Sequence, residues 1–218
     1  MKKVIIFGLL LFVVSGVFAQ QAVIKELSGT VEIKRPGSTI WEPAAIGNII
    51  MGNTVISTGF KSQALLSIGN SVLAVRPLTR LTLTELSAQA GTETINVNLQ
   101  AGRVRAEINP PAGARANVTT QTPVATASVR GTVYEIDVFS IWVSEGSVEY
   151  SGSSGNPVII SAGGTSSVDE KTGRAAPPIE TMASLFAPDL PIGFEYLNTF
   201  DCAVKQNDLD AIGIIDFP

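Results

Sequence analysis

Hydrophobic and polar residues alternate along most of this chain, in short runs that glycine, proline and asparagine interrupt. The clearest run extends from Val133 to Val138, and the pattern resumes at Ile141 and Val143 and again beyond Gly146. Alternation with a period of two is typical of a strand that buries one face. The sequence therefore predicts three consecutive strands, the first of which turns Tyr134, Ile136 and Val138 towards the core.

A second pattern of the same kind predicts a β-hairpin between residues 64 and 74. Apolar residues occupy alternate positions in Ala64–Ile68, and a turn at Asn70-Ser71 follows. Val72 and Ala74 repeat the alternation after the turn, so we place both on the buried face of the hairpin.

Composition extends this interpretation to the whole chain. A hydrophobic content of 45% with 16% charged residues is enough for a sizeable core, and 20 glycines with frequent Val, Ile and Thr favour many short strands. The expected fold class is all-β, with the short strands stacked in a β-roll or irregular β-solenoid; a two-sheet sandwich is the alternative. A glycine two places before a valine recurs without a fixed period, at Gly29, Gly102, Gly131 and Gly146.

The ends of the chain differ in character from the middle. Lys2 and Lys3 precede an apolar run, Val4–Val14, and a small residue at Ala19, which predicts a cleavable signal peptide over 1–19. No cysteine lies near the cleavage point, so we expect a periplasmic or secreted protein without a lipid anchor and with no transmembrane segment after signal removal. Residues 20–170 form the expected β domain.

The remaining residues, 171–218, are predicted to be a linker and an acidic appendage. A short helix is expected over 179–187, before Pro188 and Pro191. The aromatic and acidic residues that follow suggest either a strap on the domain or a segment that binds a partner.

Charge and residue content exclude several functions. Of 15 basic residues, 13 remain once Lys2 and Lys3 are removed, against 19 acidic ones, so the mature net charge is −6 and nucleic acid is not an expected partner. Histidine is absent and Cys202 is the single cysteine, which removes the commonest nucleophile pairs and zinc ligands.

Other candidate chemistry is weak. No phosphate-loop or dinucleotide motif occurs, so no cofactor or metal is predicted. Two carboxylate pairs, Glu135 with Asp137 and Glu145 with Glu149, have the spacing of solvent-facing residues on a strand. We therefore predict that the protein is not an enzyme.

Two segments resemble a known signature. Val129–Ile136, which contains Arg-Gly-Thr, and Val143–Val148, which contains Glu-Gly, are similar to the motif of FecR-type periplasmic domains. Upstream segments stand in the order which that family shows: 27–31, 47–50, 55–59, 64–70 and 99–104. The resemblance covers residues 22 to 165 and implies a compact all-β domain.

The family also suggests roles for individual residues. Its motif falls on Arg130, Gly131, Thr132, Glu145, Gly146 and Gly102, and we interpret all six as structural. Arg130 is expected to lie near backbone carbonyls or a carboxylate, and Gly131 to adopt a conformation that alanine tolerates poorly.

The resemblance implies protein contacts rather than chemistry. FecR-type domains often belong to membrane-spanning regulators of sigma factors, but this chain offers no long apolar run beyond its signal. The preferred hypothesis is a non-enzymatic exported module that binds an envelope or secreted protein, through exposed strand edges, with a possible link to envelope signalling. The alternative is a secreted protein that binds a glycan or small ligand, for which Trp41, Trp142 and Tyr150 are the candidate aromatic residues.

Overall fold

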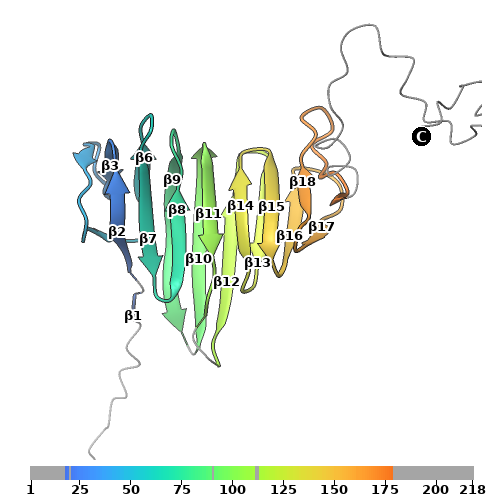
Figure 1. Cartoon of the computed structure of the whole chain (residues 1–218), viewed down its shortest axis with the longest axis horizontal. Coiled ribbons are helices and arrows are strands. Elements are labelled where there is room, and N and C mark those ends of the chain that lie inside the picture. Colours follow the sequence, from blue (N-terminus) through green and yellow to red (C-terminus); the bar gives the residue numbers. More distant parts are fainter. Residues whose placement is uncertain (1–17, 20, 90, 111–112, 179–218) are drawn as a thin grey trace, which may run out of the picture. The chain divides into compact units, whose positions relative to one another are not determined.

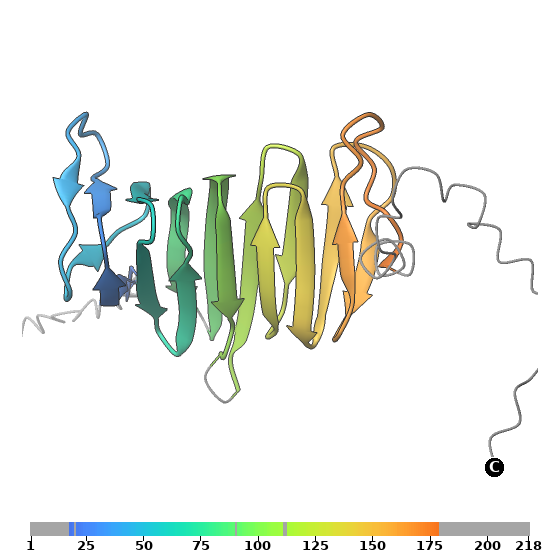
Figure 2. The same cartoon turned by 45° about the horizontal axis from the view of Figure 1, so that its top comes forward.

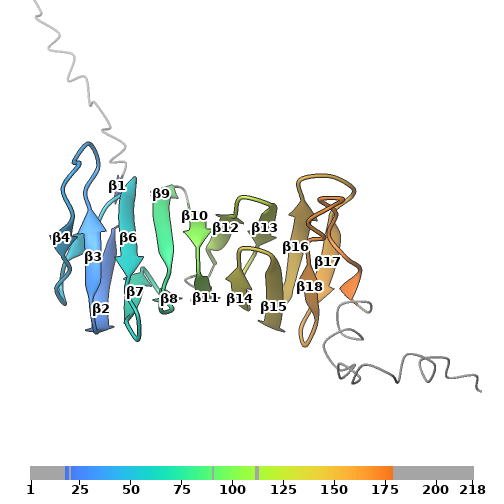
Figure 3. The ribbon, with the colours of Figure 1, turned by 90° about the horizontal axis from the view of Figure 1, so that it is seen from above.

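A computed structural model describes residues 18–19, 21–89, 91–110 and 113–178. These residues form two β-sheets, and no helix connects their strands. The all-β prediction is therefore confirmed. Because the two sheets face one another in two layers (Figure 3), the arrangement is that of a sandwich, which was the alternative architecture. Within the described part of the chain, no helix has the length and hydrophobicity that crossing a bilayer requires.

The ten-stranded sheet follows the spatial order β17 (Val158–Ser161), β16 (Ser147–Gly152), β13 (Ala125–Val129), β12 (Arg115–Gln121), β10 (Thr92–Ala101), β9 (Arg80–Gln89), β6 (Thr54–Thr58), β3 (Val31–Lys34) and β4 (Glu42–Pro43), with β1 (Phe18–Ala19) paired to β9. The eight-stranded sheet follows the order β18 (Thr165–Ser167), β15 (Ser140–Glu145), β14 (Val133–Asp137), β11 (Arg103–Glu107), β8 (Ser71–Val75), β7 (Gln63–Ile68), β2 (Ala22–Ser28) and β5 (Ile49–Ile50).

The chain advances steadily along the stack while it moves back and forth between the two sheets. Figures 1 and 2 show this progress as a colour change from blue at β2 to orange at β18. Neighbouring strands are antiparallel except β10 and β12, which are parallel. Stacking of short strands in chain order is the feature of the predicted β-roll that the structure retains.

Four of the passages from one sheet to the other occur at the recurring glycines. Each of them separates two strands that belong to different sheets, and each has a positive φ: Gly29 (71°), Gly102 (83°), Gly131 (64°) and Gly146 (77°). A residue in the left-handed region turns the strand direction sharply, and glycine adopts this region without a Cβ clash. The pattern noticed in the sequence therefore marks corners between the sheets.

Side chains from both sheets fill one apolar core between the layers. Tyr134 of β14 and Thr120 of β12 are fully buried and share a hydrogen bond of 2.8 Å between their hydroxyl oxygens, so a polar contact joins the two sheets inside the core. Burial raises the pKa of Tyr134 to about 12, and the hydrogen bond with Thr120 lowers it only in part. This phenol stays neutral at physiological pH.

The predicted strands between Val133 and Tyr150 are β14, β15 and β16, and their buried faces largely follow the alternation. Tyr134 and Ile136 are buried as predicted, whereas Val138 is only half-buried, beyond the end of β14. Val133 is buried as well, because the pairing of β14 with β15 shifts by one residue at this point.

The hairpin of β7 and β8 exists, but its second strand has the opposite orientation to the prediction. Ile68 pairs with Ser71, so the turn consists of Gly69-Asn70, and Leu73 and Val75 enter the core. Val72 and Ala74 therefore face outwards. A shift of one residue in a hairpin exchanges the two faces of the strand, which explains the error.

The described chain extends past the predicted domain end at residue 170. The N–H of Ala176 donates to the carbonyl oxygen of Ser167 at 2.8 Å, and Val168 forms a β-bridge with Ala175. The division at 170/171 stays a prediction. Cys202, the helix expected over 179–187 and the acidic appendage lie outside the described residues, as does the signal peptide except for Phe18–Ala19.

Candidate binding surfaces

The two halves of the sequence motif meet at one corner of the sandwich. A Cβ on Gly146 would lie 2.6 Å from the methyl carbon of Thr132 and 3.2 Å from the carbonyl oxygen of Gly131. Thr132 is buried, and its carbonyl oxygen accepts a hydrogen bond of 3.0 Å from the N–H of Ile108. Glu145 is exposed. The Arg-Gly-Thr and Glu-Gly segments are therefore packed against each other, and Gly146 is required by this close approach.

The corner at Gly102 is built in the same way, with Thr79 as the contact. A Cβ on Gly102 would lie 2.5 Å from the Cα atom of Thr79 and 2.6 Å from the carbonyl oxygen of Leu78. The N–H of Arg103 donates to the Thr79 hydroxyl at 3.0 Å. At Gly29, the N–H of Thr30 donates to the Ser62 hydroxyl at 2.8 Å. Two corners thus use a glycine and a hydroxyl residue of a neighbouring turn.

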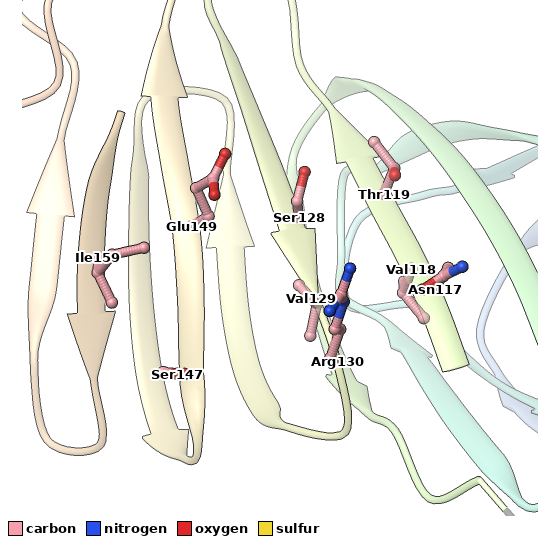
Figure 4. Close-up of a pocket in the computed structure, with 9 residues that line it drawn as sticks. All are labelled: Asn117, Val118, Thr119, Ser128, Val129, Arg130, Ser147, Glu149 and Ile159. Carbon is pink, nitrogen blue, oxygen red and sulfur yellow. The ribbon is translucent and has the colours of Figure 1, made fainter. Parts of the chain in front are cut away.

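Arg130 differs from the sequence-based expectation. Its side chain is exposed, and within the described residues it forms no hydrogen bond or ion pair with a carbonyl or a carboxylate. It lies instead at the rim of a hollow of about 500 Å³ on the outer face of the ten-stranded sheet (Figure 4). The other residues that line this hollow are Asn117, Val118, Thr119, Ser128, Val129, Ser147, Glu149 and Ile159.

The outer face of the eight-stranded sheet carries a network of charges. Glu135 accepts from Arg76 at 3.1 Å and from Arg103 at 3.4 Å, and Arg103 also donates to Asp137 at 3.0 Å. Both carboxylates are thus bound to guanidinium groups. The pair shows no free acid or base of the kind that general acid-base catalysis needs.

Asp137 is also held by the turn that follows β14. One of its oxygens accepts from the N–H groups of Phe139 and Ser140, and the other accepts from the Ser140 hydroxyl. Burial raises the pKa of Asp137, but these hydrogen bonds and the Arg103 charge outweigh it, so the pKa lies below its usual range. Asp137 therefore fixes the β14–β15 turn as an anion.

The second carboxylate pair is divided between the two sheets, because Glu145 belongs to β15 and Glu149 to β16. In the described part of the chain, no group of three or more His, Cys, Asp or Glu side chains could hold a metal ion.

The three aromatic residues singled out as possible glycan contacts do not gather in one place. Tyr150 is buried, and its hydroxyl donates to the carbonyl oxygen of Phe139 at 3.0 Å. The ring of Trp41 lies under Lys34 and Arg80, with 5.1 and 5.5 Å between cation and ring centroid. Trp142 is 45% exposed on β15.

Sequence reasoning missed an apolar pair on two adjacent turns. Phe60 is 74% exposed and Leu78 is 62% exposed, and the N–H of Leu78 donates to the carbonyl oxygen of Gly59 at 3.1 Å. Leu78 has a φ of 55° and Lys61 a φ of 53°, in a region that side chains other than glycine rarely adopt. Periodicity carries no signal for such residues because they lie between strands.

Residues 54–149 match the model of the family described as FecR protein. The match includes all six motif residues and confirms the resemblance over this range. No curated protein matches the chain.

This chain is similar to two crystal structures of a candidate anti-sigma factor from Parabacteroides distasonis ATCC 8503, which were determined at 1.65 and 2.50 Å resolution. Their sequence identities are 14% and 15%, with TM-scores of 0.45 and 0.44. Each alignment covers 60% of this chain and less than two thirds of the other chain, 64% and 63% respectively.

Proposed function

We propose that this chain, which carries a FecR domain over residues 54–149, is a non-enzymatic exported module that contacts another protein of the cell envelope. The family match supports a role connected with envelope signalling. The ion-paired carboxylates, together with the absence of histidine from the sequence, support a function without catalysis.

The exposed pair Phe60 and Leu78 is the observation that carries this proposal. A few anchor residues that a partner buries in pockets supply most of the binding energy of a protein interface, and Phe is among the residues enriched there. Here the backbone holds Leu78 outwards in a left-handed conformation that costs a non-glycine residue about 1–2 kcal/mol. Strain of this kind is retained at functional sites, since a relaxed turn would be more stable.

Strand edges, the contact that the sequence and the family resemblance predict, are less suited to it. The terminal strands β4 and β5 have two residues each, and β4 contains Pro43, which lacks an N–H group. At the other end, Ala175 bridges to the residue after β18. Short and proline-containing edges are typical of sheets that avoid pairing with another chain.

The surroundings of the apolar pair define the partner's chemistry. Leu78 lines a hollow of about 350 Å³ together with Arg80 and Gln100. Lys61 lies over the Phe60 ring at 5.6 Å and, like Arg80, forms no ion pair within the described residues. The partner surface should therefore present an apolar pocket with carboxylates at its rim.

The proposal is tested by affinity capture from envelope extract with the full chain tagged at its C-terminus. The intact mass of the same preparation reports whether residues 1–19 are removed. A Phe60→Ser/Leu78→Asn variant should lose the captured partner, because each exposed anchor contributes about 1–2 kcal/mol or more when buried. Asparagine tolerates the left-handed backbone of position 78, so the fold should persist.

Ile40→Ser is the matched control, since Ile40 is 68% exposed on a different loop. The partner identified by mass spectrometry is then purified and its Kd measured for all three proteins. An equal Kd for the double variant and the wild type would refute the assignment of this surface.

A further inference from the structure

Three ordered rows of polar side chains cross β10, β12, β13 and β16 on the outer face of the ten-stranded sheet. Pairing of β10, β12, β13 and β16 aligns the rows Asn98, Gln121, Thr126, Ser151 and Asn96, Thr119, Ser128, Glu149. The third row begins with Thr94 and Asn117 and ends with Arg130 and Ser147, which continue the same register. Ten of these twelve side chains end in a hydroxyl or amide group.

Most of these groups have no partner in the protein. Within the described residues, eight of the ten side chains form no hydrogen bond, namely Thr94, Asn98, Asn117, Thr119, Gln121, Thr126, Ser128 and Ser147. Neighbouring strands lie about 4.8 Å apart and alternate residues of a strand about 6.8 Å apart, so the free groups form a regular lattice. The hollow of about 500 Å³ lies over its second and third rows (Figure 4).

This face differs from an ordinary solvated sheet. Soluble proteins usually intersperse Lys, Arg, Glu and Asp over about a quarter to a third of their surface, and the eight-stranded sheet does so with Arg76, Arg103, Glu135 and Asp137. The polar rows contain only Arg130 and Glu149 as charged residues, of opposite sign. Charged side chains would be enough to keep this face soluble. The short uncharged groups at these positions therefore indicate selection for a property other than solubility.

The chemistry of the face excludes two classes of ligand. It lacks the aromatic and apolar anchors of a protein interface, since Val118 and Val129 are buried and Ile159 is the one exposed apolar side chain among the residues that line the hollow. A nucleic acid needs several cations for its phosphates, and Arg130 stands alone there. Hydroxyl and amide groups that both donate and accept match the hydroxyl groups of a sugar chain instead.

We propose that this face binds an extended, uncharged glycan chain, which lies across the strands along the polar rows. Each sugar would exchange hydrogen bonds with side chains of successive strands, and Arg130 would donate to hydroxyl oxygens at one end of the hollow. A flat lattice suits a stiff, extended chain because both surfaces are already ordered, which lowers the entropic cost of binding. This inference does not rest on the proposed protein contact, which uses different residues.

Cosedimentation of the full chain with insoluble polysaccharide tests the inference. The probes are chitin, cellulose and isolated peptidoglycan sacculi, whose glycan strands share the β-linked sugar chemistry. We expect saturable binding to chitin or cellulose. Binding to chitin or cellulose identifies the sugar chain itself as the ligand, whereas binding to sacculi alone would indicate their charged peptides and would contradict an uncharged glycan.

Variants connect binding to the face. Thr119→Lys/Ser128→Lys fills the hollow and should weaken binding at least tenfold, and the milder Asn117→Ala/Gln121→Ala should weaken it severalfold. Ser67→Lys, at an outward position of the eight-stranded sheet, and Phe60→Ser/Leu78→Asn should bind like the wild type. Thermal melting of each variant verifies folding. No binding to any probe, or equal binding by the wild type and both face variants, would overturn the proposal.

Discussion

Replacement of Gly102 by alanine tests how the corners between the sheets are built. Two costs combine at this position. The φ of 83° places a residue with a side chain in the left-handed region, at about 1–2 kcal/mol. The new Cβ would also meet the Cα atom of Thr79 at 2.5 Å and the Leu78 carbonyl oxygen at 2.6 Å, which are backbone atoms that cannot rotate away. Overpacking of this kind costs about 1–3 kcal/mol.

Gly131 provides a matched comparison because only the first cost applies to it. Its φ is 64°, but a Cβ there would meet nothing closer than the Cδ atom of Pro110 at 4.0 Å. We therefore expect Gly131→Ala to lower the free energy of unfolding by about 1 kcal/mol, after the gain from a less flexible unfolded chain.

Gly102→Ala carries both costs and the same gain, so it should lower the free energy of unfolding by about 1.5–4 kcal/mol. Urea denaturation measures both variants, and in a domain of this size each kcal/mol corresponds to a shift of about 2–4 °C in Tm. Equal losses for the two variants would show that Thr79 and Leu78 yield to the new methyl group and that close approach does not explain this glycine.

Two further predictions concern the polar groups that the fold encloses. Tyr134→Phe leaves the buried Thr120 hydroxyl without its partner and should lower the free energy of unfolding by about 1–3 kcal/mol. The double variant Tyr134→Phe/Thr120→Val should lose less than the sum of the two single changes, and additive losses in this double-mutant cycle would contradict a hydrogen bond between the sheets. The pKa of Asp137 is lowered in the folded state, so its carboxylate should stabilise the protein above the unfolded pKa of about 3.9, and this contribution is lost as the pH falls through the folded pKa. The difference in free energy of unfolding between the wild type and Asp137→Asn should therefore shrink from pH 7 to pH 3, and a constant difference would refute the assignment.

Much of the fold follows from periodicity, since every second residue of a strand meets the core. The alternation predicted β14, β15 and β16, because every second side chain of a strand meets the core. The sequence also marked Gly146 as the start of a strand, but the change of sheet at this glycine is seen only in the structure. The orientation of β8 depended on a single residue in the turn, and Gly69-Asn70 and Asn70-Ser71 are both plausible turn pairs. Alternation alone cannot choose between them when Val72 and Leu73 are both apolar.

The candidate surfaces were much less predictable than the strands. Phe60 and Leu78 lie eighteen positions apart, and they become neighbours because β6 pairs with β9 and hydrogen bonds join the turns that adjoin these strands. The sequence predicts that Arg130 lies near backbone carbonyls or a carboxylate, but its side chain is exposed on the outer face, one residue before the corner at Gly131. Such outcomes depend on which strands become neighbours, and a linear pattern does not contain this information.

The two outer faces of the sandwich are where selection for binding can choose residues independently of the core. Inward positions are constrained by the shared core, so their residues report folding rather than binding. Outward positions carry no such constraint, and the two sheets differ in the kinds of polar side chain that occupy them. Ion pairs on the eight-stranded sheet neutralise one another and stabilise a turn through Asp137. The polar rows of the ten-stranded sheet leave most of their hydrogen-bonding groups unused by the protein, although a few mutual bonds would have been simple to form. Groups that a fold keeps free at this density are best explained by a ligand that they meet.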